Sequence, residues 1–138
     1  MTNPKRQARI IAMQALCQWD AQQDQSAEAL AAFLEAQHAH YKAVAYATQL
    51  VQAFWEDPGR VDRLIEAAAT DWSLTRMATV ERNTMRVAVV ELLHQVTPAK
   101  VALDEAIEIG KEYGGQESPG FINGVLDRVL KNVEGDKS

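Results

Sequence analysis

Three cations near the start of the chain are the first side chains whose type and spacing suggest binding chemistry. Lys5, Arg6 and Arg9 precede the first acidic residue. We expect them on the opening turns of a helix, at the edge of its apolar stripe and on its exposed side. Cations at a helix N-terminus oppose the helix dipole, at a cost of roughly a few tenths of a kcal/mol each. Two explanations of these cations are therefore equally good: they bind a ligand, or they are the solvated start of an ordinary helix.

The other reactive side chains do not form a recognisable catalytic or metal site. His38 and His40 point to different faces of a helix and have no cysteine or third histidine nearby. Cys17 is far in sequence from any histidine. One expected helix carries four carboxylates without the Glu-x-x-His pairs of a di-metal site, so they indicate a solvated face: Asp104, Glu105, Glu108 and Glu112. We therefore expect that the protein is not an enzyme and that it binds neither a metal ion nor a cofactor.

Length and composition indicate a single all-α domain over residues 1–138. Hydrophobic residues make up 47% of the chain, which is enough to bury a core. Alternating strand patterns are hard to find. The single cysteine excludes an internal disulfide, and neither a membrane-spanning run nor a cleavable signal is evident, so we expect a cytoplasmic protein. The net charge of −5 means that any electropositive patch is local.

Apolar residues at the helical period predict five helices before residue 97. They are a helix over residues 5–19, a short helix capped by Ser26, a buried central helix over 41–56, a helix capped by Asp57, and a longer helix over 77–96. Each tryptophan is in phase with its helix stripe, which favours packing between helices over base stacking: Trp19, Trp55 and Trp72.

The last third of the chain predicts two more helices, joined by a glycine-containing turn. Thr97 can cap the first of them, ahead of a proline at the first helical position. Gly114-Gly115 then ends it, because glycine enters the left-handed conformation without steric cost. Ser118, again ahead of a proline, opens the second helix.

Four segments resemble the NusB family of transcription antitermination factors, in the same order and at the same distances: RQARIIAMQALCQWD, VERNTMRVAVVELL, PAKVALDEAIEIGKEYGG and ESPGFINGVLDRVL. The resemblance implies an all-α fold of about seven helices in two packed subdomains. It also implies a function, which is to bind the boxA element of nascent RNA jointly with NusE, a small-subunit ribosomal protein. RNA polymerase in this antitermination complex then passes terminators, chiefly in ribosomal RNA transcription.

The resemblance also suggests which side chains would contact RNA. Lys5, Arg6 and Arg9 match the arginine-rich N-terminal arm of the family, whose cations neutralise phosphates, and Lys100 and Lys111 are weaker candidates. About three phosphate contacts with single-stranded RNA predict that log K falls with log salt at a slope near −2. Because family members often carry more N-terminal arginines, we expect weak RNA binding that tightens with the partner.

Two further parts of the resemblance concern the RNA loop and the partner. Tyr113 matches the end of a helix near the RNA, where its ring would stack on a splayed base for about 1–3 kcal/mol, although packing against the bundle is an equal expectation. Glu81, with Arg82 and Arg86 beside it, matches the helix that faces NusE. Glu81 is not a helix-face neighbour of Arg82, so we expect at least one of these charges to face outward.

Three alternatives remain open from the sequence. A domain of this kind also precedes ribosomal RNA methyltransferases, but the 138 residues contain no βαβ pattern or glycine-rich cofactor loop, which favours a standalone factor. The second alternative is a helical adaptor that binds a protein and no RNA. The third is a homodimer formed through the apolar face that would meet the partner.

Overall fold

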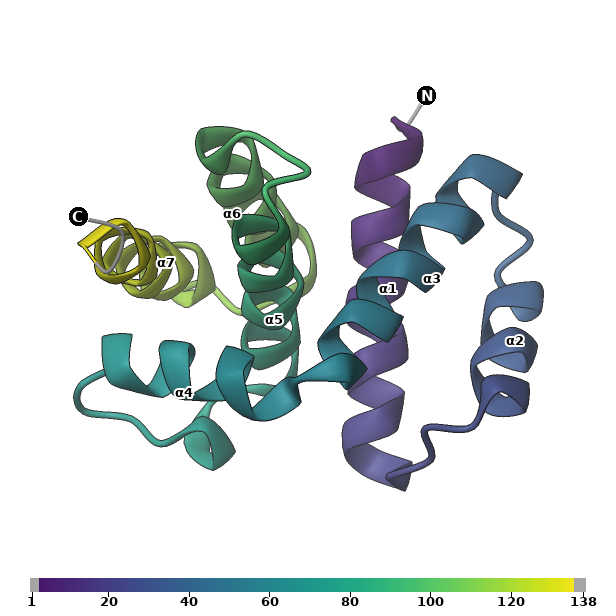
Figure 1. Cartoon of the computed structure of the whole chain (residues 1–138), viewed down its shortest axis with the longest axis horizontal. Coiled ribbons are helices and arrows are strands. Elements are labelled where there is room, and N and C mark those ends of the chain that lie inside the picture. The colour runs from purple at the N-terminus through teal and green to yellow at the C-terminus, as the bar shows by residue number, and fades with distance from the viewer. Residues whose placement is uncertain (1–2, 136–138) are drawn as a thin grey trace.

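The computed structural model describes residues 3–135, and in this part of the chain all regular secondary structure is helical (Figure 1). The all-α expectation of about seven helices is confirmed. None of the helices in the described range has the length and apolar character needed to cross a bilayer. The elements are α1 (Pro4–Gln22), α2 (Ala27–Ala36), α3 (Tyr41–Glu56), α4 (Pro58–Ala68), a short 3-10 helix η1 (Leu74–Arg76), α5 (Thr79–His94), α6 (Ala99–Tyr113) and α7 (Ser118–Gly135).

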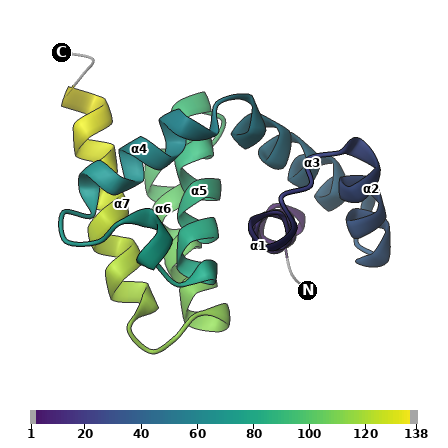
Figure 2. The same cartoon turned by 90° about the horizontal axis from the view of Figure 1, so that it is seen from below.

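The helices form two groups that meet along α5. Figures 1 and 2 show α1, α2 and α3 on one side of the molecule and α4, α6 and α7 on the other. Helix α5 contacts α1 and α3 of the first group and α4, α6 and α7 of the second. Every residue from 83 to 92 is therefore buried. The central helix is α5 and not α3, which buries one face only.

The side-chain caps that the sequence predicted are present at α2 and α4 but not at α6. The Ser26 hydroxyl accepts the Ala29 N–H at the start of α2, and the Asp57 carboxylate accepts the Arg60 N–H at the start of α4, as expected. The prediction that Thr97 caps α6 is wrong. Pro98 occupies the capping position without a side-chain bond. The Thr97 hydroxyl instead donates to the carboxylate of Glu91 on α5.

The junction between α6 and α7 depends on close packing rather than on left-handed backbone. Gly114 has φ −96° and ψ −170°, so the prediction of a left-handed glycine is wrong. A Cβ at Gly114 would lie 2.6 Å from Oγ of Ser118, which only glycine avoids. The Ser118 hydroxyl accepts the Gly115 N–H at 2.9 Å and donates to Oε2 of Glu81 at 2.6 Å. It therefore joins the turn to α5.

The three tryptophans differ in their packing. Trp19 meets Phe54 edge to face, with 5.4 Å between ring centroids. Trp55 is partly buried against the core. Trp72 is 50% exposed, so the prediction of packing is wrong for this residue. Helix α4 ends at Ala68, and the stripe that placed Trp72 on the buried face does not continue that far.

Gly110→Ala and Gly124→Ala test the close contact of α6 with α7. A Cβ at Gly110 would lie 2.7 Å from Cδ1 of the buried Ile122, whereas a Cβ at Gly124 meets nothing within 4 Å. Gly124→Ala should raise the free energy of unfolding by about 0.5–1 kcal/mol, because alanine favours the helix. Gly110→Ala should be less stable than Gly124→Ala by about 1–3 kcal/mol, because the core becomes overpacked. Urea denaturation measures both, and equal effects would contradict this packing.

Candidate nucleic-acid interface

The start of α1 presents one cation without a carboxylate partner in the described chain. The Asn3 side chain caps this helix by accepting the Lys5 N–H at 2.8 Å, and Pro4 follows the cap. Lys5 is exposed, and its Nζ lies 5.7 Å from the ring centroid of Tyr46. A cation–π contact leaves the full charge in place, so the Lys5 ammonium remains able to bind a phosphate.

Arg6 is held by a carboxylate but keeps part of its guanidinium exposed. Its Nε and Nη2 both donate to Oε2 of Glu105 on α6, at 2.9 and 2.5 Å. The Arg6 side chain is 42% exposed, and Nη1 has no hydrogen-bond partner among residues 3–135. The Glu105 contact orients the guanidinium, and Nη1 remains for an anion.

Arg9 does not lie on the exposed side of α1, and that prediction is wrong. Arg9 is 3% exposed, with Nε and Nη2 donating to the two carboxylate oxygens of Glu91 at 2.9 and 3.0 Å. Its Nη1 donates to Oε1 of Glu105 at 3.2 Å. Burial alone would lower the pKa of Arg9, but the bonds and charge of Glu91 outweigh burial and raise it. The guanidinium has no free face for a phosphate.

Glu91 on α5 is the centre of this buried cluster. Its side chain is completely buried. Besides the two bonds from Arg9, its Oε2 accepts hydrogen bonds from the hydroxyl groups of Tyr46 at 2.5 Å and Thr97 at 2.7 Å. A buried carboxylate requires such donors, because an unpaired charge in the core is strongly destabilising. The cluster therefore joins α1, α3, α5 and the segment before α6.

The two lysines of α6 are exposed and only weakly paired. Lys100 Nζ lies 3.7 Å from Asp104, and Lys111 Nζ lies 3.1 Å from Glu108. Their side chains are 88% and 58% exposed, so these ion pairs contribute little. Both lysines can reach a phosphate, but each has a carboxylate beside it that reduces the local positive potential.

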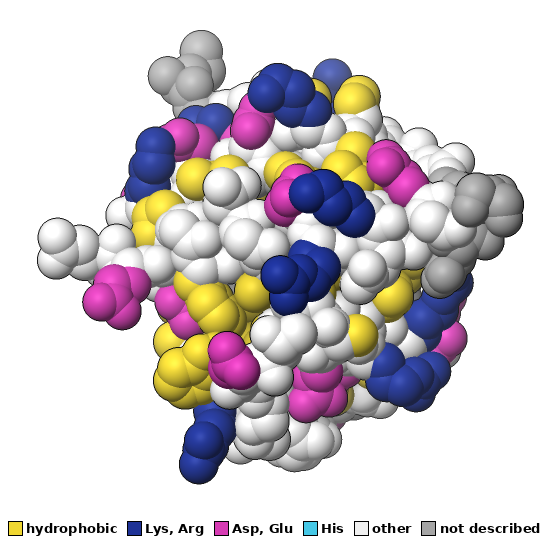
Figure 3. All heavy atoms as spheres, turned by 90° about the vertical axis from the view of Figure 1, so that its left-hand side faces the viewer, with side chains coloured by type: hydrophobic (Ala, Val, Ile, Leu, Met, Phe, Trp, Pro, Cys, Tyr) yellow, Lys and Arg dark blue, Asp and Glu magenta, His cyan; other side chains and the backbone are white. Residues whose placement is uncertain are grey.

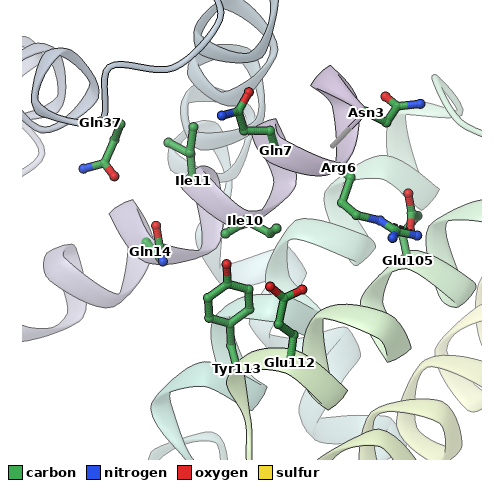
Figure 4. A pocket seen from close by; sticks show the side chains of 10 residues that line it. All are labelled: Asn3, Arg6, Gln7, Ile10, Ile11, Gln14, Gln37, Glu105, Glu112 and Tyr113. Atoms are coloured by element: carbon green, nitrogen blue, oxygen red, sulfur yellow. Dashed lines mark hydrogen bonds and ion pairs between the residues drawn. The ribbon is translucent and has the colours of Figure 1, made fainter. Parts of the chain in front are cut away.

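A groove with a volume of about 680 Å³ lies between α1 and α6, next to Arg6 (Figure 4). Tyr113, the last residue of α6, lines this groove with a side chain that points toward α1. The residue is 39% exposed. The structure thus brings Arg6 and Tyr113 to one groove, while Lys5 lies beside Arg6 on α1.

The three residues expected to face the partner are all bonded within the chain. Arg82 Nε donates to Asp20 at 3.0 Å, and Arg86 donates to Asp20 and to Asp62, each at 2.9 Å. Burial would raise the pKa of Asp20, but the bonds from Arg86 and its neighbours outweigh burial and lower it. Both arginines are therefore paired with carboxylates, whereas Glu81 is half-buried, accepts the neutral Ser118 hydroxyl and has no cation as a partner within residues 3–135.

An apolar groove of about 300 Å³ beside the first turns of α7 was not predicted from the sequence. It lies between α7 and the segment after α4, and its lining includes Trp72, Phe121 and Gly124. Figure 3, which views this side of the molecule, shows hydrophobic side chains gathered between charged ones. Spacing gave no signal for it, because Trp72 is in phase with the apolar stripe of the preceding helix.

The sequence of the chain matches a known family over most of its length. Residues 6–131 match the NusB family. The chain belongs to the NusB family. A relative from Anaeromyxobacter dehalogenans, named transcription antitermination protein NusB, is 42% identical over 134 residues, which cover 96% of this chain and 94% of the relative. A relative of the same name from Trichlorobacter lovleyi is 39% identical over 126 residues, covering 91% and 89%.

Solved NusB structures agree with this assignment. The T. maritima NusB structure has a TM-score of 0.82 at 35% identity, covering 95% of this chain and 93% of the other. A structure of antitermination factors NusB and NusE in complex with dsRNA contains a chain with a TM-score of 0.84 at 26% identity, covering 96% and 99%. The NusB resemblance and its fold are confirmed, and the family is one of antitermination factors rather than enzymes.

Arg9→Ala and Arg6→Ala distinguish the structural arginine from the exposed one. Arg9→Ala should lower the free energy of unfolding by about 3–5 kcal/mol, because it leaves Glu91 buried without its cation. Arg6→Ala should cost about 1 kcal/mol, because its pair with Glu105 is only partly buried and Glu105 keeps its bond from Arg9. Chemical denaturation followed by circular dichroism measures both. Similar losses for the two variants would contradict the burial of Arg9.

Proposed function

We propose that this NusB-family chain acts in the cytoplasm as an antitermination factor, binding boxA-type RNA jointly with NusE within the RNA polymerase antitermination complex. The observation that carries the proposal is the position of Lys5 and Arg6, which present positive charge at the end of the α1–α6 groove. The likeness to a NusB chain solved with NusE and dsRNA supports it.

The RNA side of the proposal rests on four cations rather than on the whole N-terminal arm. Lys5 and Arg6 supply the main phosphate contacts, and Lys100 and Lys111 on α6 supply weaker ones. Arg9 supports this surface from inside the protein through Glu91 and makes no phosphate contact. Three of the four exposed cations have a carboxylate within 4 Å. Binding of RNA by the chain alone is therefore weak.

The partner side of the proposal is the apolar groove around Trp72 and Phe121. A half-exposed tryptophan beside a groove is typical of an anchoring residue in a protein interface. Glu81 is bonded to Ser118 at the start of α7, three residues before Phe121, and adds a negative charge at the edge of this surface. Arg82 Nη1 donates to the backbone carbonyls of Leu74 and Met77 and so holds the segment that follows Trp72.

The central experiment compares RNA binding with and without NusE. A boxA-containing oligonucleotide and a scrambled one are titrated with the chain alone and with an equimolar mixture of the chain and NusE. We expect a preference for boxA that is weak for the chain alone and stronger in the mixture. Complex formation without any RNA preference favours the adaptor alternative. Neither complex nor preference would refute the proposal, and sedimentation at two concentrations tests the homodimer.

Lys5→Gln tests the phosphate contact at the start of α1. Each phosphate contact with single-stranded RNA contributes about 0.7 to the slope of log K against log salt. The variant should therefore flatten the slope by about 0.7 and weaken binding equally for boxA and scrambled RNA. Lys131→Gln, which removes an exposed lysine of α7, should leave the slope unchanged. An unchanged slope for Lys5→Gln would remove Lys5 from the RNA surface.

Trp72→Ala tests the partner surface. We expect NusE to bind this variant about 30-fold more weakly, the loss that about 2 kcal/mol at an interface anchor gives. Tyr41→Ala is the matched control, because Tyr41 is an exposed aromatic residue at the start of α3, outside the groove. Isothermal titration calorimetry with NusE measures both variants. Equal affinities for Trp72→Ala and the parent chain would place the partner elsewhere.

A further inference from the structure

Helix α2 is more apolar than its position in the fold requires. Eight of its ten residues are alanine, leucine or phenylalanine, and the other two are Glu28 and Glu35. A helix that is apolar all round is typical of a protein interior. Yet α2 packs chiefly on α1 and lies at the edge of the molecule in Figures 1 and 2, and within it only Leu30 and Leu34 are buried. The sequence of α2 therefore suits a helix that is covered on a second side.

A groove with a volume of about 490 Å³, the α2–α3 groove, lies along that second side. Its α2 wall consists of the exposed Ala27 and Ala31 together with the two buried leucines. Val44, Thr48 and Gln52 line it from α3, and the Thr48 hydroxyl already donates to the carbonyl of Val44 at 2.8 Å. The lining is therefore mostly apolar, and the small alanine side chains let another helix approach α2 closely.

The charges beside the α2–α3 groove are acidic and unpaired. Glu35 lines the groove, and Glu28 lies almost two turns earlier on the same side of α2. Neither carboxylate forms an ion pair within residues 3–135. Glu35 is in the last turn of α2, where a negative charge opposes the helix dipole. Lys42, the single lysine or arginine of α2 and α3, is two residues from Val44 and so faces another side of α3.

We propose that the α2–α3 groove docks a basic amphipathic helix of a partner protein. The apolar stripe of such a helix fills an apolar groove. Its lysines or arginines, seven residues apart, meet Glu28 and Glu35, which are separated by about 10.5 Å along the axis of α2. The α2–α3 groove shares no lining residue with the α1–α6 groove or with the groove around Trp72, so its occupant does not compete with a ligand of either.

A synthetic peptide with blocked ends and a fluorescent label is the probe. It has about fourteen residues, or four helical turns, with leucines along one face and lysines seven residues apart at the edge of that face. A second peptide has glutamates in place of the lysines. We expect the parent chain to bind the lysine peptide about tenfold more tightly than the glutamate peptide, because ion pairs replace repulsions. Fluorescence anisotropy at low salt measures both.

The double variant Glu28→Lys with Glu35→Lys tests the charges. It should reverse the preference and bind the glutamate peptide more tightly than the lysine peptide. Asp127→Lys with Glu134→Lys is the matched control, because these exposed carboxylates of α7 have the same spacing and their replacement changes the charge equally. The control should keep the preference of the parent chain. Since the reversal is a gain of binding, a misfolded variant would not produce it.

Ala31→Gln tests the wall of the α2–α3 groove. A longer, polar side chain at this exposed position should weaken binding of the lysine peptide by about fivefold or more. Ala32→Gln makes the same change at an exposed alanine of α2 that does not line the groove, and should leave binding unchanged. Circular dichroism checks that both variants keep the helical fold.

Four results would overturn the proposal. The first is equal binding of the two peptides by the parent chain, and the second is no binding of either peptide below about 1 mM. The third is binding of the dye anilinonaphthalene sulfonate that Ala31→Gln abolishes and neither peptide displaces, which would assign the groove to a small apolar molecule. The fourth is self-association in sedimentation that Ala31→Gln abolishes, which would make the groove an interface between two copies. None of these results bears on binding of RNA or NusE.

Discussion

The structure depends on one buried carboxylate. Glu91 lies near the C-terminal end of α5, within the buried stretch of residues 83–92, where an unpaired charge would be strongly destabilising. Its donors come from Arg9 on α1, Tyr46 on α3 and Thr97 before α6. Because these bonds have defined directions, they fix how α1 lies against α5. The α1–α6 groove and the position of the exposed cations follow from that arrangement.

A second cluster of charges fixes the other end of α1. Asp20 accepts bonds from Arg82 and Arg86 of α5, and Arg86 also binds Asp62 of α4 while its guanidinium lies 4.9 Å from the ring centroid of Phe54. The two clusters bury Arg9 and Arg86 and hold Arg82 partly buried. This use of charge explains why a family resemblance based on cations overestimates the positive surface available for RNA.

The sequence predicted what is local and periodic. Apolar spacing placed α3, α5 and α6 within about two residues of their observed ends, and short-range bonds made the caps Ser26 and Asp57 predictable. The predictions that failed concern features that apolar spacing does not reveal. Arg9 is turned inward by a carboxylate 82 residues away, and Trp72 is exposed because its helix stops early. Left-handed helix ends occur at non-glycine residues such as Gln95.

The distribution of charge also bears on how such a surface achieves specificity. Exposed cations with carboxylates beside them attract any polyanion weakly, because the local potential is small and is screened further by salt. If the proposed function holds, affinity must then come from contacts that only a particular ligand makes, such as those of a partner protein on a separate face. A surface with unpaired Arg9, Arg82 and Arg86 would bind RNA more tightly but with less discrimination. Burying these arginines stabilises the fold and at the same time limits sequence-independent binding.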